Sequence, residues 1–274
     1  MIPDILERKF TRIGARLKHV DRPSRSRSFS TGLSGGRVRL DVQTDGNGEF
    51  FAIVGGADSE ANVEVLDVQP TDRHLLLMVR QDGEKSKFLC GHDERHWFVA
   101  AVPESAPVGT VRAAKEALKP VEVQAIQARL GLRWNERNRR KNAAYRRQGE
   151  WFFVPAPDLK VDERLILRDE PITRGAGSKP HRAEFCYRSG GENVYVCTRF
   201  PNGLTERNYR RLLEKLPEAR NWSWSVMSRN AAAVYVRGRV RHADHKTITL
   251  DGWHRVLMNT ESQAKAMRHV AFLD

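Results

Sequence analysis

The sequence of 274 residues has few of the features that assign a protein to a class at once. It has three cysteines, Cys90, Cys186 and Cys197, and this odd, widely spaced set argues against a disulfide framework and for a reducing compartment. No run approaches the roughly 18 apolar residues of a membrane-spanning helix. The N-terminal stretch MIPDILERKFTRIGARLKHV has no continuous apolar segment and no small-residue cleavage site. We therefore expect no signal peptide, no membrane partner and a cytoplasmic location.

Sequence signatures of several common catalytic folds are absent as well. We find no P-loop, no Rossmann glycine fingerprint, no HExxH segment and no zinc-finger array of cysteines and histidines. Proteins whose chemistry depends on these motifs are therefore not expected. The function has to be sought in less regular groups of residues.

Positive charge is abundant, and it is unevenly distributed. The formal net charge is +13, from 47 Lys/Arg and 34 Asp/Glu. Residues 1–39 carry ten Lys/Arg and three Asp/Glu, residues 40–128 carry eight and fifteen, and residues 129–147 carry eight and one. A basic tail, an acidic block and a basic connector are therefore separate electrostatic regions, and the two basic ones favour a polyanionic partner such as nucleic acid.

Hydrophobic periodicity predicts a mainly β (α+β) protein, with two small β-rich barrel or sandwich domains joined by a helical, basic connector. Short alternating runs with turn signals between them predict six strands between residues 37 and 107. The predicted divisions are a basic N-terminal helix and flexible linker (1–36), an acidic β-rich domain (37–108), the helical basic connector (109–147), and a second β-rich domain with one helix (148–274).

In the second domain, two segments decide where chemistry could lie. The run from Val234 to Arg241 alternates like a strand, and further strand-like runs follow, so His242 and His245 are expected where a hairpin reverses. The segments FCYRSGG and VYVCTRF are predicted to pair as another hairpin, with a helix from Thr205 to Leu216. Trp222 and Trp224 are expected on one face of a strand, either as core residues or as a platform for stacking.

A first candidate site is the segment CGHDERH, in which Cys90, His92 and His96 have the spacing C-x-H-x3-H. A thiolate and two imidazoles would suit zinc, but a structural zinc site needs a fourth ligand and no second Cys/His pair lies nearby. The favoured interpretation is a polar turn between two strands, structural and metal-free.

A second candidate is formed by His181, His242, His245 and Glu261, with Glu184 as another possible oxygen ligand. Histidines that flank a hairpin turn come close enough to reach one ion. Three imidazoles and a carboxylate would suit a divalent metal such as zinc, or iron or manganese. The alternative is that these histidines are solvated residues at a surface turn.

Several segments between residues 145 and 261 carry a resemblance: YRRQGEWFFVP, then KPHRAE, then VRHADHKTITLDGWHRV, and finally MNTE. This succession resembles a group of small uncharacterised bacterial proteins with R-Q-G-D, G-H-x-H and H-x-E-H segments. No activity can be carried over from that group. The chain departs from it at Glu150, where the group has Asp, and at Ala183, where a second His would be expected, which removes one imidazole from the implied metal site.

The connector, residues 129–147, interleaves aromatic and basic side chains. Its guanidinium and ammonium groups would neutralise phosphates, and its two aromatic rings could stack on unpaired bases. The alternative is that it docks on the acidic first domain. The residues expected to contact nucleic acid are Arg133, Trp134, Arg137, Arg139, Arg140, Lys141, Tyr145, Arg146 and Arg147.

Two functions follow from these patterns. The first is a cytoplasmic nucleic-acid-binding protein, for RNA or single strands in particular because aromatic residues accompany the basic ones. The alternative is a metal-dependent enzyme that uses the His/Glu site of the second domain, with phosphodiester hydrolysis as the reaction expected of a metal beside a basic groove. The patterns do not predict an oligomeric state.

Overall fold

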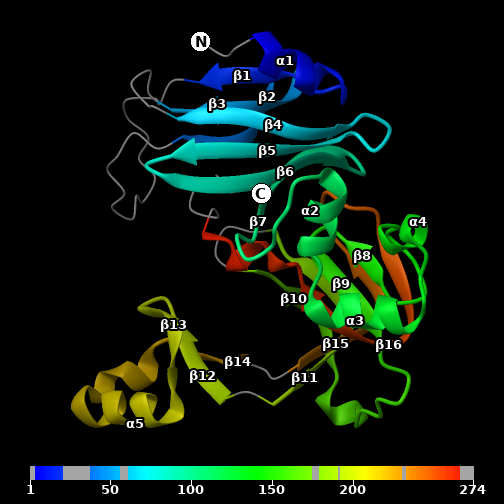
Figure 1. The fold of residues 1–274 in the computed structure, drawn as a ribbon. Coiled ribbons are helices and arrows are strands. Elements are labelled where there is room, and N and C mark those ends of the chain that lie inside the picture. Colours follow the sequence, from blue (N-terminus) through cyan, green and yellow to red (C-terminus); the bar gives the residue numbers. More distant parts are fainter. Residues whose placement is uncertain are drawn as a thin grey trace.

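The computed structural model describes residues 4–20, 38–55, 61–174, 179–190, 192–229 and 233–265, with backbone only at 192, 201–202 and 227–229. Within these ranges the chain is mainly β and forms several separate sheets (Figure 1), which confirms the predicted β-rich class. The predicted flexible linker falls in residues 21–36, outside the described residues. None of the described helices is long and apolar enough to cross a membrane.

Two open sheets pack face to face in the first domain. Residues from both sheets, among them Phe51, Leu75 and Phe88, share one buried core, as in a β-sandwich. The six strands predicted from alternation are all present, because each turns one apolar face to this core. The sheets have the orders β1-β3-β2 and β4-β5-β6-β7. Their strands are β1 (Leu17–Val20), β2 (Arg39–Asp45), β3 (Gly48–Val54), β4 (Asn62–Gln69), β5 (His74–Gln81), β6 (Glu84–Asp93) and β7 (His96–Val102).

The N-terminal segment belongs to this domain. Helix α1 (Asp4–Thr11) buries Leu6 and Phe10 in the same core, and the Phe10 and Phe51 ring centroids are 5.1 Å apart. β1 then pairs in parallel with β3. The four-residue strand LKHV was not predicted, because it is too short to show a period of two.

The connector helices attach to both domains. They are α2 (Val111–Ala117), α3 (Val121–Arg129) and α4 (Trp134–Arg137). Thr110 begins α2 by accepting a hydrogen bond from the Ala113 N–H, and Pro120 precedes the first residue of α3. Val111 and Ala114 of α2 pack on the outer face of the sheet that contains β5 and β6, while Val123 of α3 packs on Phe152 of the second domain.

One antiparallel sheet of six strands, in the order β10-β11-β15-β16-β9-β8, makes up the body of the second domain. The runs predicted beyond residue 246 merge into a single strand, β16, in which Gly252 takes a φ of +94°. The strands are β8 (Arg146–Gln148), β9 (Trp151–Pro155), β10 (Leu167–Ile172), β11 (His181–Ser189), β15 (Ala233–Arg241) and β16 (Ile248–Met258), with short 3-10 turns at Glu163–Leu165 and Thr260–Gln263.

The predicted hairpin of FCYRSGG with VYVCTRF is wrong. β11 pairs with β15, and the second run becomes β12 of a separate lobe. The lobe contains β12 (Glu192–Cys197), β13 (Phe200–Thr205), α5 (Glu206–Lys215), a 3-10 turn (Pro217–Asn221) and β14 (Ser225–Arg229), with the sheet order β13-β12-β14. Trp222 and Trp224 precede β14, so their predicted place on a strand is also wrong. A pair of neighbouring strand-like runs could not reveal that each has a partner further along the chain.

Candidate metal centre

The strand register explains why His181 meets His242. Arg182 of β11 pairs with Arg241 of β15, so one step further along each antiparallel strand His181 lies opposite His242. His245 follows in the loop that joins β15 to β16. The three histidines predicted from sequence are therefore brought together at one end of the sheet.

The three imidazoles are close enough to share an ion. One nitrogen from each of His181, His242 and His245 lies within 4.8 Å of the others. Ring centroids are 4.1 Å apart for His181 and His242, and 4.7 Å apart for His242 and His245. Zinc–nitrogen bonds of about 2.1 Å in a tetrahedral site place ligand nitrogens about 3.4 Å apart. The rings are stacked at interplanar angles of 26° to 29°, so ion binding would require the nitrogens to approach by about 1 Å and the rings to turn toward one point.

The turn between β8 and β9 approaches the histidines at Gly149. This residue has a φ of +57°, and a Cβ built on it would lie 2.8 Å from Nε2 of His245 and 3.5 Å from Nε2 of His181. A methyl group would therefore collide with the His245 ring, and only glycine lets these two nitrogens lie so close to the backbone.

Burial favours the neutral form of His181 and His245, and three of their ring nitrogens have no hydrogen-bond partner among the described residues. His181 is 1% exposed, and neither of its ring nitrogens has a hydrogen-bond partner among the described residues; nor has Nδ1 of His245. Burial lowers the pKa of His181 to about 3, helped by the charges of His242 and His245. The pKa of His245 is lowered too, first by burial and then by His242. Neutral imidazole is the form that binds metals.

Two further contacts hold the loop that carries His242 and His245. Gln148 is buried, and its Nε2 donates to the carbonyls of Val240 (3.3 Å) and Lys246 (2.8 Å). The Asp244 N–H donates to Nδ1 of His242 at 3.1 Å. Nε2 of the same ring lies 3.2 Å from the carbonyl of residue 179, so both His242 nitrogens have partners and binding an ion would require this ring to give up one hydrogen bond.

A carboxylate from the first domain stands behind His245. Glu94, in the turn between β6 and β7, accepts a hydrogen bond from the Lys246 N–H at 2.7 Å, and its Oε2 lies 3.7 Å from Nδ1 of His245. The Nε2 atom of the same ring faces Gly149. A carboxylate behind the outer nitrogen of a ligand histidine is the usual arrangement around protein-bound zinc.

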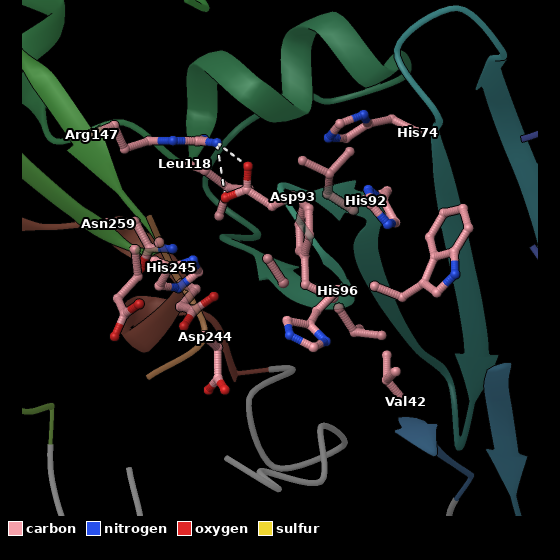
Figure 2. Close-up of a pocket in the computed structure, with 18 of the residues that line it drawn as sticks. Val42, His74, His92, Asp93, His96, Leu118, Arg147, Asp244, His245 and Asn259 are labelled. Atoms are coloured by element: carbon pink, nitrogen blue, oxygen red, sulfur yellow. Dashed lines mark hydrogen bonds and ion pairs between the residues drawn. The ribbon is translucent and has the colours of Figure 1, made fainter. Parts of the chain in front are cut away.

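His242 and His245 border a cavity of about 870 Å³ that is lined by residues of both domains and the connector. Figure 2 shows His245, Asp244 and Asn259 on one side and His74 and His92 on the other, with Arg147 extending to Asp93 between them. A centre at His242 and His245 would therefore open onto a space large enough for a small-molecule substrate.

The predicted oxygen ligands lie outside the histidine group. Glu261 is buried, and its Oε1 accepts a hydrogen bond from Arg174 at 2.5 Å. Glu184 accepts hydrogen bonds from the backbone and side chain of Arg239, at 2.9 and 3.1 Å. In the described part of the chain, the metal-ligand group consists of His181, His242 and His245 without a carboxylate.

Cys90, His92 and His96 occupy separate environments. Cys90 is fully buried in the sandwich core, where burial raises the pKa of its thiol. The His92 ring packs edge-on against Trp97 at 4.9 Å, and Nδ1 of His96 lies 2.5 Å from Glu49 at the surface. These side chains do not form a ligand group among the residues that the structure describes.

Parts of the connector contact the first domain, as the docking alternative expected. Arg140 pairs with Asp93 and Glu94, and Arg147 Nη2 lies 3.3 Å from both Asp93 oxygens. Asp93 ends β6, and Glu94 follows it in the turn to β7. The acidic block and the basic connector therefore neutralise each other at this point.

The aromatic residues of the connector are also largely internal. Tyr145 is 2% exposed, its ring packs on Phe152 at 4.9 Å, and its hydroxyl donates to the carbonyl of Arg137 at 2.7 Å. The guanidinium of Arg112 lies 3.5 Å from the ring centroid of Trp134. Half-buried Arg137 and Arg146 donate to backbone carbonyls. Of the basic residues between 129 and 147, Arg129, Arg133, Arg139 and Lys141 remain exposed.

Comparisons with known proteins add no assignment. We find no protein-family model, no curated protein and no solved structure that matches the chain. The resemblance of residues 145–261 to the bacterial group stays a prediction.

Sequence reasoning missed the residues that surround the histidines. Gln148 and Gly149 belong to the R-Q-G-E segment noted for its resemblance, but nothing in the sequence connects that turn to His245. Glu94 was assigned to another candidate site. Of these three residues, only Gly149 could have been noticed from the sequence, because a glycine between two strands often marks a close approach of the backbone to another group.

Proposed function

We propose that the protein is a divalent-metal-dependent enzyme whose ion, zinc in the first instance, is held by His181, His242 and His245. The observation that carries this proposal is that one nitrogen from each imidazole lies within 4.8 Å of the others, with Nε2 of His181 and of His245 beside Gly149, while neither nitrogen of buried His181 has a hydrogen-bond partner among the described residues. Buried polar atoms without hydrogen bonds are uncommon, and each costs about 1–3 kcal/mol. An ion would give one of the His181 nitrogens a partner.

Three protein ligands suit a catalytic rather than a structural site. Structural zinc sites are closed by four protein ligands, whereas catalytic ones use three and leave a position open. When bound, such an ion polarises a substrate oxygen and activates water near neutral pH. The chain's own part is to hold three imidazoles beside the cavity.

For the substrate we propose a phosphodiester. Arg140 and Arg147 line the same cavity as His245. A guanidinium has five N–H donors, and its planar fork matches phosphate oxygens. Arg147 makes long contacts with Asp93, so it keeps donors for an incoming anion. The cavity's acidic side chains outnumber its basic ones by seven to six, and a divalent ion would reverse that balance.

The test compares metal binding and hydrolysis in three proteins: the parent, His242→Ala/His245→Ala, and the control His92→Ala/His96→Ala. The proteins are stripped with chelator and titrated with zinc by calorimetry, and hydrolysis of bis(p-nitrophenyl) phosphate is then followed. We expect one zinc per chain in the parent and the control, and none in the first variant. A parent that takes up no metal would overturn the proposal.

Two further results separate the metal centre from the reaction. Zinc, manganese and iron(II) are each tested, because three imidazoles accept all of them. If a metal binds at one ion per chain but hydrolysis is seen with none of the three metals, the proposed metal centre stands and the proposed phosphodiester substrate is rejected. Equal loss of metal in both double variants would place the ion elsewhere.

A further inference from the structure

The lobe of residues 192–229 is an insertion that the six-stranded sheet does not need. β11 and β15 already pair as far as Ser189 and Ala233, so a short turn would suffice to join them. The chain instead builds a sheet of three strands and helix α5, which Figure 1 shows standing apart from the two domains. An insertion that adds no strand to the neighbouring sheet points to a separate role.

Aromatic side chains dominate this lobe. Among the side chains of the lobe that the structure describes, the buried ones are Val194, Cys197 and Ala219. The larger rings are only half-buried, which is unusual for aromatic residues that serve as a core. These rings are Tyr195, Phe200, Tyr209, Trp222 and Trp224.

Three of these rings lie side by side in nearly parallel planes. Centroids of Phe200, Trp222 and Trp224 are 5.9 to 6.2 Å apart, with interplanar angles of 16° to 24°. Rings at this spacing are offset and do not cover one another's faces. Trp224 is fixed by its Nε1, which donates to the carbonyl of Ala219 at 2.7 Å. The result is an anchored aromatic surface that is partly open to solvent.

Arginines without ion-pair partners accompany this surface. The guanidinium of Arg199 lies 4.3 Å from the Trp222 ring centroid, and Arg220 is two residues away in the chain. Arg207 and Arg211 are exposed one turn apart on α5. No carboxylate of the described chain pairs with any of these four, whereas Arg210 of the same helix pairs with Glu206. Arg199 beside an open ring, with exposed cations elsewhere in the lobe, complements phosphates joined to bases.

We propose that this lobe binds single-stranded nucleic acid, with bases stacked on Phe200 and Trp222 and phosphates held by Arg199 and Arg220. A single strand is favoured over a duplex because only unpaired bases can place their faces on aromatic rings. An acidic protein would engage the arginines but would leave the aromatic surface unexplained. The site is independent of the histidine group, and it would present a polymer of phosphodiesters to the protein.

The test uses the full chain in the presence of chelator, so that its outcome does not depend on the metal centre. Fluorescence anisotropy measures the binding of labelled oligothymidylate and oligouridylate of about 15 nucleotides, a length that covers one site, over about 50 to 200 mM salt. A hairpin duplex of similar charge is the comparison. The variants are Trp222→Ala, Trp222→Phe and Arg199→Gln/Arg220→Gln, with Arg133→Ala/Arg139→Ala/Lys141→Ala for the connector.

We expect Trp222→Ala to weaken binding about tenfold, since one base–ring stack contributes about 1–3 kcal/mol, and Trp222→Phe to restore most of it. Arg199→Gln/Arg220→Gln should lower the slope of log K against log salt by about 1.4, or about 0.7 per lost phosphate contact. Near-ultraviolet circular dichroism would show whether Trp222→Ala unfolds the lobe. In that case Arg199→Gln/Arg220→Gln still tests the proposal, because it changes only exposed side chains.

Three results would overturn the proposal. They are no binding by the parent, equal binding of duplex and single strand, and loss of binding in the connector variant with the lobe variants unaffected. The last of these would move the nucleic-acid site to Arg133, Arg139 and Lys141, as the sequence first suggested.

Discussion

Histidines gather in two regions of this molecule, and the two regions treat them differently. In the first domain, His92 packs on Trp97 and His96 pairs with Glu49 at the surface, while Cys90 is sealed in the core. In the second, His181, His242 and His245 turn nitrogens toward one another, and several of those nitrogens have no partner. Both groups have residue types that bind metals.

The difference lies in how the side chains reach one place. Cys90, His92 and His96 follow one another along a single hairpin, so their spacing in sequence is regular while their environments diverge. His181 is sixty residues or more from the other two, and strand pairing brings it to them. A close spacing in sequence is therefore a weaker sign of a metal site than a shared sheet end.

Of the substitutions that test this difference between the two histidine groups, Gly149→Ala should have the largest effect on zinc binding. Its methyl group would collide with the His245 ring, so we expect zinc binding to be lost in calorimetry. Gly131→Ala is the matched control, because Gly131 has a φ of +60° and nothing within 4 Å of an added Cβ. Both variants carry the same backbone strain, so a loss of zinc in both would show that strain and not the collision is responsible.

Glu94→Gln should weaken zinc binding by about 10- to 100-fold, the usual cost of removing a carboxylate behind a ligand histidine. The amide keeps an oxygen for the Lys246 N–H, so the turn should stay in place. Arg140→Gln breaks the same interdomain ion pair from the other end but leaves the carboxylate beside His245. Equal zinc affinities for Glu94→Gln and the parent would show that His245 does not depend on the first domain.

His181→Leu should separate a ligand from a structural residue. Without metal, the variant loses two buried nitrogens that have no partner, so its free energy of unfolding should be unchanged or higher by about 1 kcal/mol. With zinc at a hundred times its dissociation constant, the parent should gain about 2.7 kcal/mol and the variant nothing. Urea denaturation with and without zinc measures both quantities. A variant destabilised without metal would show that the imidazole itself supports the fold.

The same pair of proteins should differ in their response to pH. In the folded chain the pKa of His181 is about 3 and that of His74 about 4, both below the ordinary value of 6.5. Above pH 6.5 neither state takes up a proton at these sites, whereas below it only the unfolded chain does. The metal-free parent should therefore lose stability from about pH 6.5 toward pH 3, and His181→Leu should lose less. Identical slopes in denaturation at several pH values would contradict the buried, neutral state of His181.

Cys90→Ala should have the smallest effect on metal. The thiol lies in an apolar core and stays protonated, since burial raises its pKa. We expect a loss of about 1 kcal/mol of stability from the small cavity, with zinc stoichiometry unchanged. Loss of zinc from a folded Cys90→Ala protein would show that the first-domain group had been wrongly set aside.

The sequence by itself determined the β-rich class, most strands and the loop in which His242 and His245 lie. These features depend on neighbouring residues: an alternating run turns one face to a core, and a break in it ends the strand. The same local reasoning failed for β12, because the pattern of a strand does not name its partner. It also left two alternatives open for the connector, since a basic run has the same pattern whether Asp93 or a phosphate lies opposite.

Only the tertiary structure decided which residues share a site. The register between β11 and β15 sets His181 beside His242, the turn at Gly149 brings the backbone close to two ring nitrogens, and Glu94 arrives from the other domain. Glu261, predicted as a ligand, is instead engaged by Arg174. These are long-range pairings, and they depend on packing between segments that local sequence does not specify.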